Sequence, residues 1–133
     1  MEPEKRDLEI VAVKSHWQEV NPPILTGASG ITHRFNFVFK DGPDRLVFDI
    51  FDSAQRNRDL NEIDVMNTYI KKYDIGASAY IICPAEKITE EARKIATEYQ
   101  RNGIEIVPSD RIVSRFSRKA MKRKPKSRRR FAA

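Results

Sequence analysis

The sequence predicts an α/β domain in three layers, in which a mixed central sheet is flanked by helices. Two apolar runs with strand periodicity, residues 31–39 and 45–51, flank the turn sequence KDGPD. Two further short apolar runs, residues 77–83 and 104–108, each follow a segment with helical periodicity. Strands that are separated by helices pair in parallel through right-handed crossovers, whereas a hairpin pairs antiparallel. The sheet is therefore expected to contain both kinds of pairing.

The first element is expected to be a helix over residues 3–19. Apolar positions at Leu8 and Val11 recur among charged residues behind Pro3, which fits the start of a helix. The run EIVAVK is also compatible with a short strand. The sequence NPP that follows ends either element, because proline has no amide donor and restricts the residue before it.

A β-hairpin follows the loop TGASG. Phe35, Phe37 and Phe39 alternate with other residues, so a regular strand would place the three rings on one face. The Asp-Gly pair in KDGPD is a strong hairpin signal. The returning run RLVFDIF is apolar except for Asp49, and a carboxylate in such a run needs a partner because burying an unpaired charge is costly.

The second half alternates helices and strands. Ile63, Met66, Ile70 and Tyr73 recur at helical steps and Gly76 offers a stop, which predicts a helix. The run ASAYIICP reads as a strand buried on both faces. The segment KITEEARKIATEYQRNG predicts a further helix, IEIVP a final strand, and SDRIVSRF a short helix.

The charges divide the chain into a domain over residues 1–114 and a basic tail over residues 115–133. The full chain has 25 Lys or Arg and 19 Asp or Glu, and ten of the basic residues lie in the tail, which has no acid. The domain is therefore mildly acidic and the tail strongly cationic. Clustered cations gain affinity for nucleic acids by releasing phosphate counterions. The expected nucleic-acid-binding residues are Arg115, Arg118, Lys119, Lys122, Arg123, Lys124, Lys126, Arg128, Arg129 and Arg130.

The composition also indicates the cellular compartment of the protein and excludes some cysteine-based chemistry. There is no run of about 18 apolar residues and the N-terminal sequence is charged, which predicts a cytoplasmic protein, nucleoid-associated if prokaryotic, without membrane contact. Cys83 is the only cysteine, so neither an internal disulfide nor a cysteine-based zinc site can form within one chain. Its apolar neighbours predict a buried, unreactive thiol.

The stretches TGASGITHRFNFVF, RLVFDIF, AYIICP and ITEEARKIATEYQRNGIEIVPSDRIV together resemble the restriction-endonuclease-like superfamily, called PD-(D/E)xK after its motif. They are most similar to the Mrr-type and archaeal branches, over about residues 17–114. The resemblance implies a restriction-endonuclease-like three-layer fold. In that family two hairpin carboxylates bind Mg²⁺ and a lysine helps to activate water. The resemblance also implies a possible homodimer, for which the exposed face of AYIICP or the helix after it could serve.

The family motif maps only partly onto this sequence. The resemblance places His33 in the loop-and-strand signature, Asn36 at the first metal-binding aspartate, Asp49 at the second acid and Phe51 at the lysine. Asn36 offers a neutral oxygen, and Phe51 can neither activate water nor balance phosphate charge. Only Asp49 remains as a weak metal ligand, so the motif appears in degenerate form.

Three functions follow as expectations. The first is a nucleic-acid-binding protein, with DNA the expected target, on a nuclease-like scaffold without an intact metal site. The second is an active Mg²⁺-dependent endonuclease whose site has migrated to Asp49 with Asp52, Glu9 or Glu19. The third is a protein-interaction module with a basic tether. The sequence favours binding over catalysis.

Two motif residues also have structural interpretations. In these alternatives Asp49 is expected to form a cross-strand pair with Arg34 or Arg45, and His33 to be a hydrogen-bonded histidine where the loop meets the strand. The glycines of TGASG fit a tight turn better than a phosphate cradle.

Overall fold

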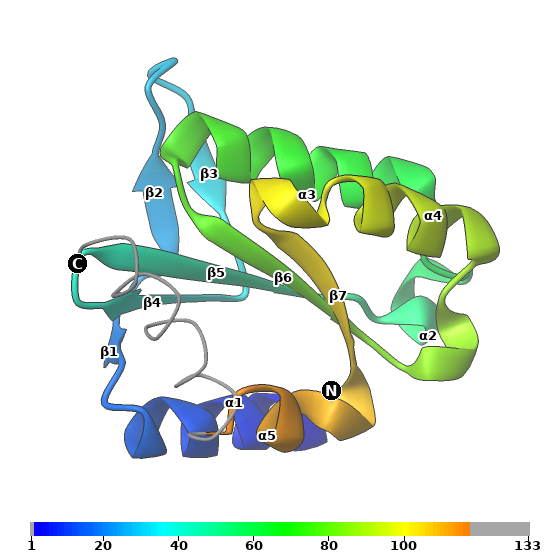
Figure 1. Cartoon of the computed structure of the whole chain (residues 1–133), viewed down its shortest axis with the longest axis horizontal. Helices are drawn as coiled ribbons and strands as arrows, with labels where there is room; N and C mark the ends of the chain where they lie inside the picture. The colour runs from blue at the N-terminus through cyan, green and yellow to red at the C-terminus, as the bar shows by residue number, and fades with distance from the viewer. Residues whose placement is uncertain (1, 118–133) are drawn as a thin grey trace, which may run out of the picture.

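A five-stranded mixed sheet lies at the centre of the domain (Figure 1). The structure, a computed structural model, describes residues 2–117. The strands lie in the order β1-β4-β5-β6-β7, antiparallel from β1 to β5 and parallel from β5 to β7. Their bounds are β1 Gln18–Glu19, β4 Phe37–Asp41, β5 Asp44–Ile50, β6 Ser78–Cys83 and β7 Ile104–Pro108. The predicted α/β class with a mixed sheet is confirmed.

Helices cover both faces of this sheet (Figure 1). On one face lie α1 Glu2–Lys14 and α5 Ile112–Arg115, and on the other lie α3 Glu62–Ile75 and α4 Glu90–Glu98. The short helix α2 Ser53–Arg56 follows β5. Because successive strand residues point to opposite faces, Phe48 packs in the α1 layer and Val47 in the α3 layer. Each layer therefore has its own apolar core against one shared sheet.

The N-terminal helix ends earlier than residues 3–19 predict. The helical interpretation of EIVAVK is right, since α1 runs from Glu2 to Lys14 and buries Leu8 and Val11. His16 then takes a positive φ of 58°, which turns the chain out of the helix. Gln18–Glu19 pairs with β4 as the edge strand of the sheet.

The segment that was predicted as the first strand of the hairpin forms two separate strands in the structure. A separate two-stranded sheet joins β2 Ile24–Thr26 to β3 Thr32–Arg34, and the main sheet begins again at β4. Between them the chain bends at Asn36, so Phe35 packs under α3 whereas Phe37 and Phe39 pack under α1. The prediction that the three rings share one face is therefore wrong, because the alternation is interrupted by the bend.

Local sequence explains where the two long helices of the second half begin and end. The side chain of Asn61 accepts hydrogen bonds from the backbone N–H groups of Ile63 and Asp64, and the Asp64 carboxylate accepts from the Asn61 N–H, a capping box. Gly76 ends α3 with a left-handed φ of 69°, as predicted. Thr89 caps α4 through the Ala92 N–H.

The apolar residues that predict α3 lie on its outer side. The residues of this helix that are buried against the sheet are Val65, Thr68 and Ile75. The stripe of Ile63, Met66, Ile70 and Tyr73 faces away, and Ile63, Ile70 and Tyr73 are 61%, 57% and 73% exposed.

The strand β6 is buried on both faces, as its apolar sequence predicts, and it lies between β5 and β7. Ala79, Ile81 and Cys83 pack in the α3 layer, while Tyr80 and Ile82 pack in the α1 layer. The expectation that AYIICP offers an exposed face to a second copy is therefore wrong.

The packed domain continues past residue 114. Phe116 is 2% exposed within the α1 layer, so its ring belongs to the core of the domain. The other predicted nucleic-acid-binding residues, from Arg118 to Arg130, lie outside the described residues. No helix in the described part of the chain has the length and apolar character needed to cross a membrane.

Candidate functional site

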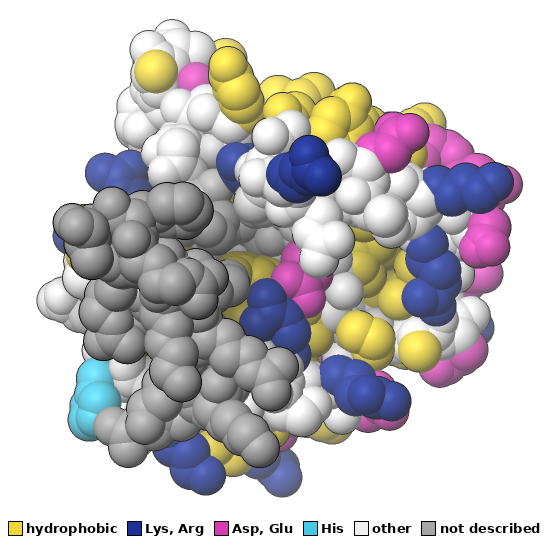
Figure 2. All heavy atoms as spheres, viewed as in Figure 1, with side chains coloured by type: hydrophobic (Ala, Val, Ile, Leu, Met, Phe, Trp, Pro, Cys, Tyr) yellow, Lys and Arg dark blue, Asp and Glu magenta, His cyan; other side chains and the backbone are white. Residues whose placement is uncertain are grey.

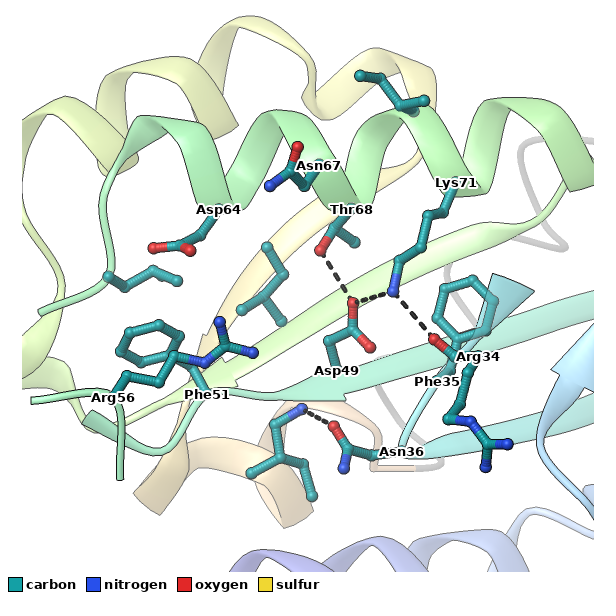
Figure 3. A pocket seen from close by; sticks show the side chains of 14 residues that line it. Arg34, Phe35, Asn36, Asp49, Phe51, Arg56, Asp64, Asn67, Thr68 and Lys71 are labelled. Carbon is teal, nitrogen blue, oxygen red and sulfur yellow. Dashed lines mark hydrogen bonds and ion pairs between the residues drawn. The ribbon is translucent and has the colours of Figure 1, made fainter. Parts of the chain in front are cut away.

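A polar pocket of about 590 Å³ opens between the end of β5 and the inward side of α3 (Figure 3). Asp49 contributes from β5 and Asn36 from the bend before β4, and Thr68 and Lys71 reach down from α3. Phe51 and Ile81 form apolar parts of the lining. The structure thus gathers three of the four predicted motif positions, Asn36, Asp49 and Phe51, into one cavity.

The centre of the pocket is a carboxylate held by two residues of α3. The Lys71 ammonium lies 3.1 Å from Asp49 Oδ2, and the Thr68 hydroxyl donates a hydrogen bond of 3.0 Å to the same oxygen (Figure 3). Lys71 also donates to the Arg34 carbonyl and lies 4.3 Å from the centre of the Phe35 ring. Asp49 is thus paired, but with a helix lysine rather than with Arg34 or Arg45 as the sequence suggests.

Asn36 is used to hold the strands together. Its Oδ1 atom accepts a 2.7 Å hydrogen bond from the Ile50 N–H, and its own N–H donates to the Phe48 carbonyl. These bonds fix the bend before β4 against β5. The side-chain oxygen that would face a metal in the family motif therefore points at the backbone instead.

Phe51 is an integral part of the core under α3. It is 6% exposed, and its N–H donates to the Ile82 carbonyl. The guanidinium carbons of Arg56 and Arg58 lie 5.5 and 5.4 Å from its ring centre, within cation–π distance. A lysine at this position would bury its ammonium among apolar residues, so the surrounding packing suits the aromatic ring.

The donor atoms do not fit a divalent cation. Mg²⁺ prefers several oxygen ligands including one or two free carboxylates. Asp49 is already paired with Lys71, and the Asn36 side-chain oxygen already accepts a hydrogen bond from the Ile50 N–H. Across residues 2–117, no group of three or more His, Cys, Asp or Glu side chains is placed to hold a metal ion.

The other acids proposed for a migrated site lie elsewhere. Asp52 accepts from the Ala54 and Gln55 N–H groups and so caps α2. Glu9 belongs to α1, which covers the opposite face of the sheet, and Glu19 belongs to the edge strand β1. None of these three residues lines the pocket around Asp49.

Positive charge surrounds the pocket on more than one side. Arg34, Arg56 and Lys71 line it, together with the carboxylates Asp49 and Asp64. Arg58 donates two hydrogen bonds of 2.6 and 2.7 Å to the Asp64 carboxylate. Burial alone would raise the pKa of this carboxyl group, but these bonds, the hydrogen bond from Asn61 and the positive charges nearby lower it below its usual value. Within residues 2–117 neither Arg34 nor Arg56 pairs with a carboxylate. Both guanidinium groups are therefore available to an anionic ligand.

His33 belongs to a separate polar cluster at the far end of α3. Its Nε2 atom lies 2.7 Å from Asp74 Oδ2, and Ser29 donates to the same carboxylate from its N–H and its hydroxyl group. Hydrogen bonds from Ser29 and His33 hold the pKa of Asp74 at about 2. His33 is thus a hydrogen-bonded structural residue, as the structural interpretation of the sequence expects, and it does not line the pocket.

Two other predicted residues have structural partners. Arg115 forms hydrogen bonds of 2.6 and 2.7 Å to Glu105, and this pairing raises the pKa of its guanidinium. It is therefore engaged within the domain rather than free for nucleic acid. Burial raises the pKa of the Cys83 thiol to about 12, which agrees with the predicted unreactive cysteine.

Sequence reasoning missed Thr68, Lys71 and the pocket arginines. Thr68 and Lys71 are three residues apart and so lie on one side of α3, beside each other. Thr68 is the one polar residue among those of α3 that are buried. The sequence feature that could have revealed the site is Thr68, a threonine on the side of the helix opposite the apolar stripe. A polar residue at that position indicates a polar partner on the sheet.

The fold defines the class of this protein as an α/β domain with a mixed five-stranded sheet between helices. No model of a protein family matches the sequence, and no curated protein matches it. A crystal structure described as a protein of unknown function, AF1548, is similar with a TM-score of 0.55 and 15% sequence identity. The match covers 78% of this chain and 56% of that one, so the chain spans little more than half the length of its structural neighbour. This likeness concerns the fold.

Proposed function

We propose that the protein binds nucleic acid, most simply DNA, on a restriction-endonuclease-like scaffold whose metal site is degenerate. The observation that carries the proposal is the pocket around Asp49. It lies where the family motif falls on the sequence, and it presents two unpaired guanidinium groups instead of free metal ligands. Arginine is well suited to phosphate because its planar fork makes paired hydrogen bonds.

The sequence beyond the described residues supports the same function. Nine Lys or Arg and no acid occur between Arg118 and Arg130. Phosphate contacts made by such residues are independent of base sequence and weaken as salt rises. The pocket would then position the phosphate backbone while the basic segment adds affinity.

The role of Asp49 in this proposal is to orient Lys71. An ammonium held between a carboxylate, the Arg34 carbonyl and the Phe35 ring has little freedom. A phosphate that enters the pocket meets this fixed positive group between Arg34 and Arg56. Binding by this arrangement needs no divalent cation.

Fluorescence anisotropy with a labelled DNA duplex in the presence of a chelator tests the proposal. The full chain is expected to bind, and the logarithm of its affinity should fall steeply between about 50 and 200 mM salt. The double variant Arg34→Ala, Arg56→Ala should weaken binding at every duplex sequence and reduce the salt slope by about 2, since each lost phosphate contact removes about 1.

Arg6→Ala is the matched control, because it removes one exposed arginine from α1 on the other face of the sheet. Its affinity should stay near that of the unmodified chain. A pocket variant that behaves like this control would contradict the role of the pocket, and the absence of binding at low salt would contradict the function itself.

A second candidate is phosphodiester cleavage in the same pocket. One observation favours it: Lys71 brings an ammonium to within 3.1 Å of Asp49, although Phe51 occupies the motif position of the lysine. Supercoiled, single-stranded and branched DNA incubated with Mg²⁺ or Mn²⁺ would be cut, and Asp49→Ala and Lys71→Ala would both abolish cutting. Intact DNA in all reactions would leave binding as the function.

A further inference from the structure

The lining of the Asp49 pocket is only partly explained by a phosphate ligand. Its cationic groups suit phosphate, but the apolar side chains of Phe51, Leu60 and Ile81 line it as well. Apolar side chains add nothing to phosphate binding, whereas they favour contact with a nucleotide base. The volume of about 590 Å³ is in the range of pockets that enclose a small molecule. The cavity therefore suits a ligand that has an apolar part as well as a negative charge.

The Asp49 carboxylate has one oxygen that the fold does not use. Its two partners on α3, the Thr68 hydroxyl group and the Lys71 ammonium group, both contact Oδ2. Within residues 2–117, the Oδ1 atom accepts no hydrogen bond, and Figure 3 shows it turned away from both partners. A carboxylate oxygen repels a phosphate group and accepts from N–H donors. This position therefore suits the amino group of a base.

Two amide side chains that line the same pocket also have free hydrogen-bonding atoms. The Nδ2 atom of Asn36 and the whole side-chain amide of Asn67 make no hydrogen bond within residues 2–117. Together with Asp49 they present both donors and acceptors, and the edge of a base carries both. Phosphate oxygens only accept at neutral pH, so a phosphate group would leave Asp49 Oδ1 unmatched.

The unpaired arginines lie to either side of Asp49. Figure 3 places Arg56 towards one end of the pocket and Arg34 towards the other, with Asp49 between them. A nucleotide within a strand has a phosphate on each side of its sugar, and the base projects from between them. Two cations around a central acceptor therefore match the pattern of one nucleotide, in which two anions flank a base with N–H donors.

The surface charges also favour contact through a short part of the ligand. On the face shown in Figure 2, the Lys and Arg side chains of the described residues are interspersed with Asp and Glu. A protein that follows the backbone of a duplex presents a patch or stripe of positive charge instead. Contact through one nucleotide needs only the few cations of the pocket.

We propose that the pocket takes one unpaired nucleotide, with its base at Asp49 and its two phosphates at Arg34 and Arg56. The inference rests on the proposed function, nucleic-acid binding at this pocket. The bases of a continuous duplex are paired and stacked, so only a single-stranded, bulged or flipped nucleotide can place its base in a cavity. The preferred ligand is therefore a nucleic acid that contains an unpaired nucleotide.

The free oxygen of Asp49 also selects between bases. Cytosine presents an N4 amino donor where thymine presents an O4 acceptor. The Oδ1 atom accepts a hydrogen bond from the first, whereas it opposes the second as one acceptor against another. The pocket is therefore expected to favour cytosine over thymine at the unpaired position.

Fluorescence anisotropy with duplexes that carry one bulged nucleotide tests the inference. One duplex sequence is prepared without a bulge and with a cytosine, thymine or abasic bulge. The three bulged duplexes have the same number of phosphates, so their sequence-independent contacts are equal. The cytosine bulge should bind at least about fivefold more tightly than the other three duplexes at the same salt concentration, because it alone gives Asp49 a donor.

The variant Asp49→Asn tests the assigned residue. An asparagine side chain can donate as well as accept, so the ratio of cytosine-bulge to thymine-bulge affinity should fall to about one. This ratio separates recognition of the base from the effect on Lys71, which changes the affinity for both bulges alike. Asp7→Asn is the matched control, because it removes the same charge from α1 on the other face of the sheet and should keep the ratio.

The outcomes distinguish this inference from the proposed function. Equal binding of the three bulged duplexes, or a cytosine preference that persists in Asp49→Asn, would overturn the inference while salt-dependent binding of the unbulged duplex leaves the proposed function in place. The absence of binding to every duplex at low salt would overturn both. Circular dichroism confirms that each variant is folded, and the comparison of bulges with the unmodified chain needs no variant.

Discussion

At the scale of single residues, Asp74 fixes the TGASG loop to the end of α3. Its carboxylate accepts hydrogen bonds from the Ser29 N–H and hydroxyl group and pairs with His33. A Cβ atom at Gly27 would collide with this carboxylate, so the first glycine of TGASG is required by close approach. The TGASG loop is thus a turn fixed to the end of α3, as its glycines suggest.

The lowered pKa of Asp74 makes a prediction about stability and pH. A carboxyl group whose folded pKa is about 2, against an ordinary value of 3.8, stabilises the fold when ionised. Its contribution is complete above about pH 4 and is lost as the pH falls through about 2. The gap in urea midpoint between the unmodified chain and Asp74→Asn should therefore shrink as the pH falls below about 4.

Asp110→Asn is the control for this measurement, because it changes an exposed acid of the described chain without touching the TGASG loop. Its urea midpoint should track that of the unmodified chain. A gap for Asp74→Asn that stays constant from about pH 5 to about pH 2 would contradict the assigned role of the carboxylate.

At the scale of elements, α3 carries different chemistry on its two sides. Its inner side gives Thr68 and Lys71 to the pocket, and its outer side gives the apolar stripe to solvent. The helix is held in place by its ends. Asn61 fixes the first turn, and Gly76 lets the chain turn directly into β6.

The capping box predicts a measurable loss when it is broken. Asn61→Ala should lower the free energy of unfolding by about 1 kcal/mol, because two backbone N–H groups at the start of α3 lose their acceptor. Urea denaturation followed by circular dichroism measures the change. Asn67→Ala is matched in residue type and helix, and Asn67 is exposed, so at low protein concentration it should change stability far less.

Element types were predictable where one signal dominates. Pro84 and Gly76 bound the β6 region, and the run between them is apolar apart from Ser78 and the hydroxyl group of Tyr80, so its burial followed directly. The bend at Asn36 was not predictable, because it depends on hydrogen bonds to β5 across the sheet. The sequence identified Asp49 as a residue of the site but did not identify its partner Lys71. Helix periodicity alone does not say which side of a helix faces the sheet.

At the scale of the whole molecule, one sheet separates two cores that differ in composition. The α1 layer is aromatic, with Trp17, Phe48 and Phe116 in mutual ring contact. The α3 layer is largely aliphatic and opens into the polar pocket. The N-terminal and C-terminal ends of the described chain meet in the aromatic layer, where α1 packs against α5.

This arrangement predicts that the last described residues stabilise the entire domain. Phe116→Ala should lower the free energy of unfolding by about 3–5 kcal/mol, because a fully packed ring is removed from the centre of the aromatic layer. Scanning calorimetry measures the effect. Val113→Ala, in the same helix but 43% exposed, should cost less than about 1 kcal/mol, and equal losses for both would contradict the packing.

The position of Trp17 has a spectroscopic consequence. It is the only tryptophan of the chain, is 7% exposed, and lies on the face of the sheet opposite Asp49. Its emission should therefore stay constant when a ligand fills the pocket and shift to longer wavelength when the domain unfolds and water reaches the indole. Intrinsic fluorescence thus separates a pocket variant that has lost its ligand from one that has lost its fold.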